Sequence, residues 1–125
     1  HFREYMQQGA CSISQTDVAR IGGVTPWLKT AHIGESFNMP ICPHYLMELH
    51  IGLCAAVPNC TWIENIPQLG VIMENELRIE EGFAYPYDTP GLGIEWNWKA
   101  IERLRVAQPA VLQTSPSNAS KRRTK

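Results

Sequence analysis

Short apolar runs alternate with longer helical patterns along this chain. The runs at 11–15, 40–43 and 60–63 have the length of buried strands. Residues 26–37 and 45–57, which lie between these runs, repeat their apolar residues at the spacing of an amphipathic helix. Because strands and helices alternate, the pattern predicts an α/β fold with a parallel sheet and right-handed crossovers.

Helix boundaries follow from residues that start or stop helices. Residues 1–9 read as the end of a helix that stops at Gly9. Thr25 and Pro26 form an N-cap followed by proline at the first helical position, so a helix is expected over 26–37. Its sheet-facing side should carry Trp27, Leu28, Ala31 and Phe37.

The second helix and the C-terminal half are read in the same way. The helix at 45–57 should present one apolar stripe, made of Leu46, Leu49, Leu53 and Val57. Residues 77–80 are expected to form a strand, 82–93 an ordered loop rich in glycine and proline, and 98–105 a last helix that follows Asn97.

The chain has 125 residues, which is too short for a closed eight-stranded barrel of roughly 250 residues. Three strands alone would leave strand edges and helix faces uncovered. The first residue is His rather than Met. We therefore expect the C-terminal part of a larger α/β protein, with βα units at 1–66, a terminal segment at 67–106 and a disordered tail at 107–125.

Composition narrows the function classes. The net charge of −1 conceals a basic tail, because four of the eleven basic residues are Lys121, Arg122, Arg123 and Lys125. The remaining body has seven basic and twelve acidic residues, which is a poor surface for nucleic acid. A solvated tail is favoured over one that contacts RNA or an acidic membrane.

Cysteines and apolar segments indicate the compartment. The four cysteines, all within apolar stretches, favour buried free thiols over two disulfides. No apolar run approaches the roughly 20 residues that span a bilayer. There is also no secretion signal, so a cytoplasmic location without membrane contact is expected.

Three acid–base residues carry the candidate chemistry. Asp17, His44 and Glu64 each stand where a short apolar strand should end, with separations of 27 and 20 residues. If the strands are parallel, these side chains reach the same rim, where α/β folds place their catalytic groups. Singly, each has an ordinary alternative as a turn residue, a surface histidine or a loop acid. Together they predict a proton-transfer site.

The sequence resembles a known family at several independent places. The stretch from Gln15 to Leu28 resembles the end of the sixth barrel strand in the mandelate racemase subgroup of the enolase superfamily. Pro40 to His44 resembles the seventh strand with its histidine, and Trp62 to Glu64 the eighth. Residues 90–96 resemble the terminal segment that returns toward the capping domain. Thr16 departs from the subgroup, which often has proline there.

The resemblance implies a modified TIM barrel, of which this chain forms only the C-terminal part, and a role for each site residue. His44 would remove the proton α to a substrate carboxylate, and Asp17 would hydrogen-bond the other imidazole nitrogen. Glu64 would hydrogen-bond the substrate carboxylate as charge develops, which works best if it is protonated. Glu48 is a candidate substrate-binding residue, although support of the core is favoured for Glu48 and His50.

The family binds Mg²⁺ through three acidic residues on earlier strands, so the resemblance implies a Mg²⁺ cofactor and no metal ligands within this chain. A zinc site made of His44, Glu48 and His50 is disfavoured, because Glu48 and His50 point in different directions on a helix. The expected reaction is dehydration of an acid sugar such as galactarate or talarate. The alternatives are racemisation or epimerisation of a 2-hydroxy acid, or an inactive fragment. A homo-oligomer is expected of the full-length form.

Overall fold

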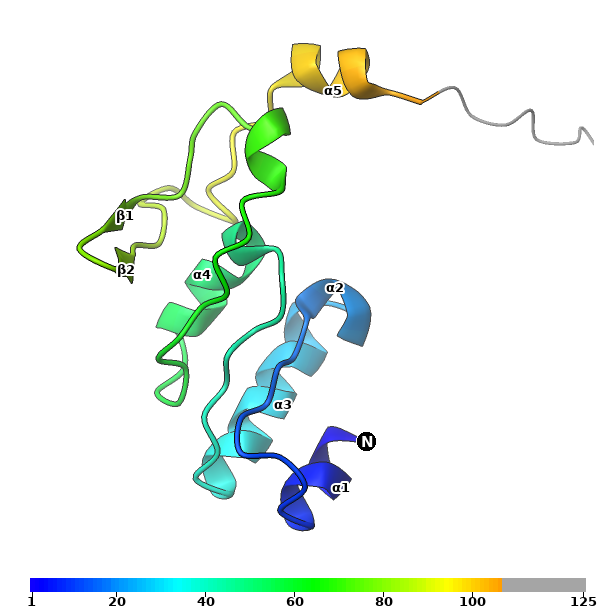
Figure 1. Cartoon of the computed structure of the whole chain (residues 1–125), viewed down its shortest axis with the longest axis vertical. Coiled ribbons are helices and arrows are strands. Elements are labelled where there is room, and N and C mark those ends of the chain that lie inside the picture. Colours follow the sequence, from blue (N-terminus) through cyan, green and yellow to red (C-terminus); the bar gives the residue numbers. More distant parts are fainter. Residues whose placement is uncertain (107–125) are drawn as a thin grey trace, which may run out of the picture.

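The computed structural model describes residues 1–106 (Figure 1), and the predicted tail at 107–125 lies outside the described residues. The expected helices occur in the expected order, with three unpredicted elements: the short helix α2, the 3-10 helix η1 and the strand β2. The elements are α1 (Phe2–Gln7), α2 (Val18–Ile21), α3 (Val24–Ser36), α4 (Met47–Ala55), η1 (Leu69–Ile72), β1 (Ile79–Glu80), β2 (Phe83–Ala84) and α5 (Trp98–Leu104).

The three predicted strand segments do lie side by side and parallel. Ile41 is the central residue, bridged to Ser14 on one side and to Cys60 on the other. Each pairing is a single bridge rather than a full strand, so the predicted strands are shorter than expected. Pro40 and Pro43 flank Ile41 and have no backbone N–H to donate, which stops the ladder on both sides.

The start of α3 differs from the sequence prediction. Asp17 caps α2, which ends at Gly22 in the left-handed region (φ 99°), and Gly23 is the N-cap of α3. The predicted N-cap, Thr25, therefore lies inside the first turn, where Pro26 needs no hydrogen-bond donor. The second glycine, Gly23 (φ 110°), allows α3 to follow the short helix α2 with almost no linker.

The buried side of α3 packs the first core cluster. Trp27 and Ala31 are buried as predicted, whereas Phe37 is 41% exposed and does not join the core. The indole Nε1 of Trp27 also donates a hydrogen bond to the backbone oxygen of Thr16 at 3.0 Å. Trp27 thus connects α3 to the segment that precedes Asp17. The other buried members of this cluster are Met6, Val18, Met39, Ile41 and Val57.

Replacing Trp27 with alanine should lower the free energy of unfolding by about 3–5 kcal/mol, because a large buried ring and a buried hydrogen bond are both lost. Phenylalanine should restore most of the packing without the hydrogen bond. Urea denaturation followed by circular dichroism measures both effects. Alanine at the 72% exposed Trp98 is the matched control, and equal losses at the two tryptophans would contradict the assignment.

Helix α4 is buried over more of its circumference than one stripe. Leu49 and Leu53 are half-buried against the first core cluster, and Val57 beyond the helix is buried there. The other side is buried too, through Met47, Glu48, His50, Ile51 and Cys54. The single-stripe prediction is therefore incomplete: two polar side chains of α4 lie inside the molecule.

The C-terminal part begins with a hairpin that the sequence predicts only in part. Strands β1 and β2 pair antiparallel, so residues expected to be loop supply β2. Glu81 (φ 50°) and Gly82 (φ 83°) connect them in two left-handed residues, which suit a tight hairpin. The signal is weak because Glu-Gly is a less typical turn pair than Asn-Gly.

The end of the described chain returns to the segment after η1. Met73 and Trp96 form an antiparallel bridge, and the Asn75 side chain donates to the Gly93 oxygen at 2.8 Å. Helix α5 starts at its predicted place, where the Asn97 side chain accepts a hydrogen bond from the Ala100 amide at 2.8 Å.

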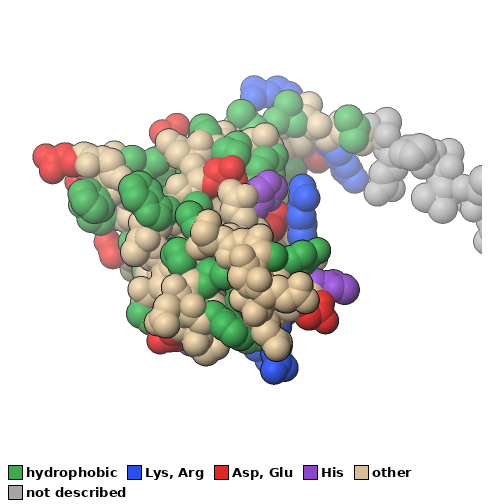
Figure 2. All heavy atoms as spheres, turned by 60° about the horizontal axis from the view of Figure 1, so that its bottom comes forward, with side chains coloured by type: hydrophobic (Ala, Val, Ile, Leu, Met, Phe, Trp, Pro, Cys, Tyr) green, Lys and Arg blue, Asp and Glu red, His purple; other side chains and the backbone are tan. Residues whose placement is uncertain are grey.

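The surface carries many apolar side chains. Figure 2 shows hydrophobic side chains reaching the surface at many points of the face that it displays. Across residues 1–106, several large apolar side chains are far more exposed than is usual in a closed fold, including Trp62, Val71, Phe83 and Trp98. Within residues 1–106, no helix has both the length and the apolar character needed to cross a bilayer. All four cysteines are free thiols, but only Cys54 is buried as the sequence predicts, and Cys11, Cys42 and Cys60 are half-buried.

Candidate active site

Asp17 lies at the end of the first parallel segment and is 5% exposed. Its Oδ1 accepts hydrogen bonds from the backbone amides of Ala19 (2.8 Å) and Arg20 (3.4 Å), which caps α2. Burial alone would raise the pKa of Asp17, but the hydrogen bond with His44 and those from the two amides hold it below its ordinary value. Asp17 is thus a fixed carboxylate.

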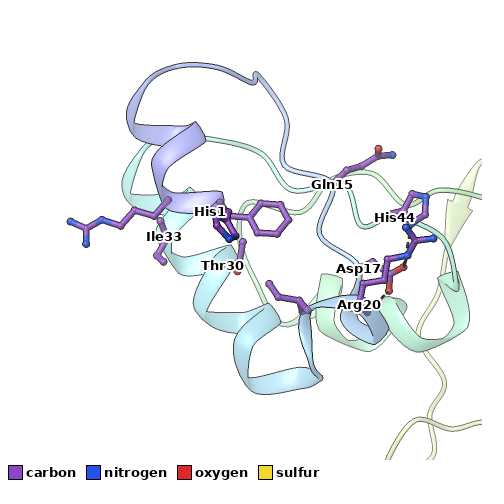
Figure 3. Close-up of a pocket in the computed structure, with 10 residues that line it drawn as sticks. His1, Gln15, Asp17, Arg20, Thr30, Ile33 and His44 are labelled. Carbon is purple, nitrogen blue, oxygen red and sulfur yellow. Dashed lines mark hydrogen bonds and ion pairs between the residues drawn. The ribbon is translucent and has the colours of Figure 1, made fainter.

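His44 follows the central segment and contacts Asp17, as the sequence predicts. Its Nδ1 lies 3.2 Å from Oδ2 of Asp17, and its side chain is one third exposed. Because a carboxylate only accepts, Nδ1 carries the hydrogen and donates. Figure 3 shows the imidazole of His44 and the Arg20 guanidinium on the Asp17 carboxylate. We call Asp17 and His44 the dyad. Because Nδ1 of His44 donates to Asp17, Nε2 is the basic nitrogen.

The backbone after His44 makes a tight and unusual turn. Tyr45 (φ 60°) and Leu46 (φ 35°) are both left-handed, and neither is glycine. Such residues cost about 1 kcal/mol or more each and persist where the surroundings hold them. This turn connects the central parallel segment to α4, which begins at Met47. The Tyr45 ring stacks near that of His44, with centroids 5.7 Å apart.

Glu64 reaches this turn from the third parallel segment. Its Oε2 accepts a hydrogen bond from the Tyr45 amide. Glu64 therefore lies on the same rim as Asp17 and His44. The amide that it binds belongs to Tyr45, the residue directly after His44. The structure therefore brings Asp17 and His44 into direct contact and places Glu64 on the amide of the next residue, Tyr45. Their catalytic roles remain a prediction.

A cleft of about 690 Å³ opens beside the dyad. Asp17, His44 and Gln15 line it at one end, and residues of α1 and α3 line the other (Figure 3). Arg20 also lines the cleft, where its Nε lies 3.4 Å from Oδ2 of Asp17. The cleft therefore leaves the exposed face of His44 accessible, with the Arg20 guanidinium nearby.

Comparison with known proteins decides the family. Residues 1–100 match the family described as Enolase C-terminal domain-like. The chain belongs to this family. Over 95 residues it is 33% identical to the L-talarate/galactarate dehydratase of Salmonella typhimurium strain LT2, a match that covers 74% of this chain and 24% of that enzyme.

Solved structures of the enolase superfamily agree with this placement. The L-talarate dehydratase from Polaromonas sp. JS666, complexed with Mg and L-glucarate, matches with a TM-score of 0.75 and 29% identity, covering 81% of this chain and 28% of that one. A racemase from Streptomyces coelicolor A3(2) with bound magnesium matches with a TM-score of 0.78 and 28% identity, covering 84% and 29%. The chain thus spans roughly a quarter of the length of these relatives.

The enolase-superfamily assignment confirms the resemblance to the mandelate racemase subgroup and a partial, barrel-type α/β fold. It also raises the question of magnesium, which these solved relatives contain. Within the described residues 1–106, no cluster of three His, Cys, Asp or Glu side chains is placed to hold a metal ion. Asp17 uses both carboxylate oxygens in its contacts with His44, Arg20 and the amides of α2. Asp17 and Glu64 therefore do not fit a magnesium site, which needs about six oxygen ligands.

Glu48 lies apart from the dyad. It is 3% exposed and lines a separate cavity of about 490 Å³ together with Asn65 and Glu76. Its Oε2 is buried and has no hydrogen-bond partner among residues 1–106. Its negative charge adds to burial in raising the pKa of Tyr87. A substrate-binding role for Glu48 remains a prediction, and its position does not bring it to the cleft beside His44.

The sequence does not predict the contact of Arg20 with the dyad, and it does not predict the hydrogen bonds of His50 beside it. Arg20 pairs with Asp17, and the available signal is its place three residues after an acid at a helix start. For His50 the sequence favours support of the core. His50 is fully buried, and its Nε2 accepts a hydrogen bond from the Val18 amide at 2.9 Å. The sequence feature that points to a polar role for His50 is its place within an apolar helix, six residues after His44.

Both Asp17 and His50 should make the fold sensitive to acid. Burial lowers the pKa of His50 below 6.5, although hydrogen bonds to Leu46 and Tyr45 oppose this. The unfolded chain therefore binds more protons than the folded one as the pH falls below about 6.5. The stability that depends on neutral His50 is present above that pH and is lost as the pH falls through the folded pKa. The lowered pKa of Asp17 adds a further loss below about pH 4.

Urea denaturation at pH 7, 6 and 5 measures this dependence. The free energy of unfolding should decrease from pH 7 to pH 5, and a His50→Leu variant should show a flatter dependence over the same range. A wild-type stability that stays level or rises on acidification would contradict the prediction. The exposed His32, replaced by leucine, is the matched control and should keep the wild-type slope.

Proposed function

We propose that this chain is the C-terminal part of an enzyme that removes the proton α to a carboxylate and dehydrates an acid sugar such as galactarate or talarate. The contact between His44 Nδ1 and Asp17 Oδ2, at 3.2 Å beside an open cleft, is the observation that carries the proposal. The similarity to the Salmonella typhimurium L-talarate/galactarate dehydratase supports the substrate class.

His44 would act as the base through Nε2. Removing the α proton turns the imidazole into an imidazolium, and the adjacent Asp17 carboxylate stabilises that charge. The two backbone amides and His44 keep Asp17 ionised, so the partner charge is in place before the proton moves. The dyad therefore lowers the cost of proton abstraction by preorganised electrostatics.

Glu64 would contact the substrate carboxylate at the same rim. Its Oε2 already accepts from the Tyr45 amide. A hydrogen bond to the enediolate would therefore use a proton on Oε1. This assignment keeps the predicted role of Glu64 and adds a second one, since the same carboxyl group holds the turn after His44.

Dehydration would proceed in two proton transfers. The α proton moves to His44, and the electron pair of the C–H bond forms the enediolate. The bond between the β carbon and its hydroxyl oxygen then breaks, and the hydroxyl leaves as water after it receives a proton. His44 in its imidazolium form is one source of that proton. The enol product tautomerises to a 2-keto-3-deoxy acid.

The remaining assignments concern the rest of the protein. Because Asp17 and Glu64 do not fit a magnesium site, we assign the metal ligands to residues outside this chain. The partner is a small acid sugar rather than nucleic acid or a membrane, and the full-length form is a cytoplasmic homo-oligomer.

Racemisation or epimerisation of a 2-hydroxy acid is the second candidate. It begins with the same proton abstraction, and the match to a racemase from Streptomyces coelicolor A3(2) favours it. The two reactions differ after the enediolate forms, because a racemase returns the proton and loses no water.

Product analysis of the intact protein tests the proposal. The protein containing this chain, with magnesium, is incubated in D₂O with galactarate, L-talarate and a panel of 2-hydroxy acids. A dehydratase yields a 2-keto-3-deoxy acid, which is detected as a semicarbazone. Solvent deuterium at the α carbon without loss of water would instead establish the racemase reaction. Neither product nor exchange with any substrate would overturn the proposal.

A further inference from the structure

A single buried imidazole connects the two backbone segments that carry the dyad. His50 is 0% exposed on α4, and its Nε2 lies 2.9 Å from the Val18 amide nitrogen. Its Nδ1 lies 3.0 Å from the Tyr45 oxygen and 2.9 Å from the Leu46 oxygen. One ring therefore makes hydrogen bonds with residues that are 27 or more positions apart in the sequence.

The hydrogen bonds define the state of the ring. The Val18 amide is a donor, so Nε2 must be an unprotonated acceptor. The carbonyl oxygens only accept, so Nδ1 must carry the hydrogen. His50 is thus held as one neutral tautomer. Protonation would set an Nε2–H against the Val18 N–H and break the connection. The lowered pKa of His50 agrees with this state.

The backbone groups that His50 binds lie directly after the two dyad residues. Val18 follows Asp17 directly, and its amide is part of the start of α2 that the Asp17 side chain caps. Tyr45 follows His44 and begins the left-handed turn. The Tyr45 carbonyl binds His50 while its amide binds Glu64, so side chains hold the turn from two sides.

We propose that His50 is a positioning residue that sets the separation and orientation of His44 and Asp17. Its effect on catalysis rests on the proposed function of the dyad, whereas its effect on the geometry does not. His50 touches neither the cleft nor the reacting atoms and acts through backbone that both dyad residues share.

If His50 only filled the core, its buried hydrogen bonds would have no explanation. An apolar side chain would occupy the same space without the cost of burying two polar nitrogens. The Trp27 ring lies 6.2 Å away at an angle of 44°, so packing is available to an apolar residue there. The charged or titratable groups that act on His50 are Asp17 and His44 themselves. Its polar atoms bind the backbone beside these two residues.

Three substitutions at position 50 separate the functions of the ring. His50→Leu keeps an apolar volume and removes both connections. His50→Asn can still donate toward the Tyr45 and Leu46 oxygens but does not reach Val18. His50→Gln can still accept from the Val18 amide but does not donate to the turn. His32→Leu on the exposed side of α3 is the matched control.

Kinetics of the intact protein and crystal structures of the variants give the result. His50→Leu should lower kcat about 10- to 100-fold with KM changed by less than about threefold, because small displacements of a catalytic group have large effects on rate. The pH profile of kcat should shift as well. His50→Asn and His50→Gln should each recover part of the rate, and His32→Leu should match the wild type.

The crystal structure of a position-50 variant tests the geometry without requiring turnover. A separation between Asp17 Oδ2 and His44 Nδ1 beyond about 3.5 Å, the outer limit of a hydrogen bond, supports the proposal. It does so even for a protein that turns over no carboxylate, in which case only the proposed function fails. If His50→Leu does not fold, the asparagine and glutamine variants supply the same readouts. Folded variants with wild-type kcat, pH profile and dyad separation would overturn the proposal.

Discussion

Replacing His44 with asparagine should lower kcat of the intact protein by about 10³-fold or more, because the base that accepts the α proton is removed. The amide of asparagine is similar in size to the near half of the imidazole and can still donate a hydrogen bond to Asp17. The fold and substrate binding should therefore persist, and KM should change little. The loss is expected in the step that breaks the C–H bond.

Exchange of the α hydrogen with D₂O measures this step directly and applies to both the dehydratase and the racemase reaction. His44→Asn should abolish exchange together with product formation, while far-ultraviolet circular dichroism stays that of the wild type. His32→Asn, which alters an exposed histidine paired with Glu35, should retain full activity. A folded His44→Asn protein that still exchanges its substrate would show that another group is the base.

Replacing Asp17 with asparagine should lower kcat by about 10²- to 10⁴-fold. The change removes the negative charge that stabilises imidazolium and allows the amide to favour the wrong tautomer of His44. Asparagine is as good an N-cap as aspartate, so α2 should stay intact, and stability should fall less than in a variant that also loses the cap. The effect of charge on catalysis is thereby separated from the effect of capping.

Asp17→Ala supplies the matched comparison. It removes the charge and the cap together, so it should add a loss of about 1 kcal/mol in the free energy of unfolding to the same loss of rate. Steady-state kinetics and urea denaturation of both variants give the two quantities. A catalytic rate for Asp17→Asn within a few-fold of the wild type would contradict the role of Asp17 in the dyad.

The hydrophobic pattern is enough to predict which segments meet and in what order. The parallel pairing of the segments around Ser14, Ile41 and Cys60 follows from strand–helix alternation, because crossovers by helices require parallel neighbours. Once the segments are parallel, their ends share a rim. The arrival of Asp17, His44 and Glu64 at one rim is therefore predictable from their places after apolar runs, whereas the hydrogen bond between Asp17 and His44 is what the family resemblance implies.

Lengths and boundaries are less predictable because local signals compete. Thr25 and Pro26 form a strong helix start, yet Gly23 begins α3 two residues earlier, since Asp17 already caps the preceding α2. The Glu81–Gly82 hairpin carries little sequence signal because a left-handed glutamate is held by pairing across the turn and not by its own preference.

By itself, the sequence determined the order of the main helices, the parallel arrangement of the three segments and the arrival of Asp17, His44 and Glu64 at one rim, because these depend on periodicity and on residue types at strand ends. Only the tertiary structure decided how the dyad is held. The left-handed turn at Tyr45 and Leu46 and the ring of His50 between Val18 and that turn depend on contacts between distant segments. The sequence around a residue such as His50 does not indicate which distant backbone groups its side chain will bind. These hydrogen bonds form only when the segments pack together.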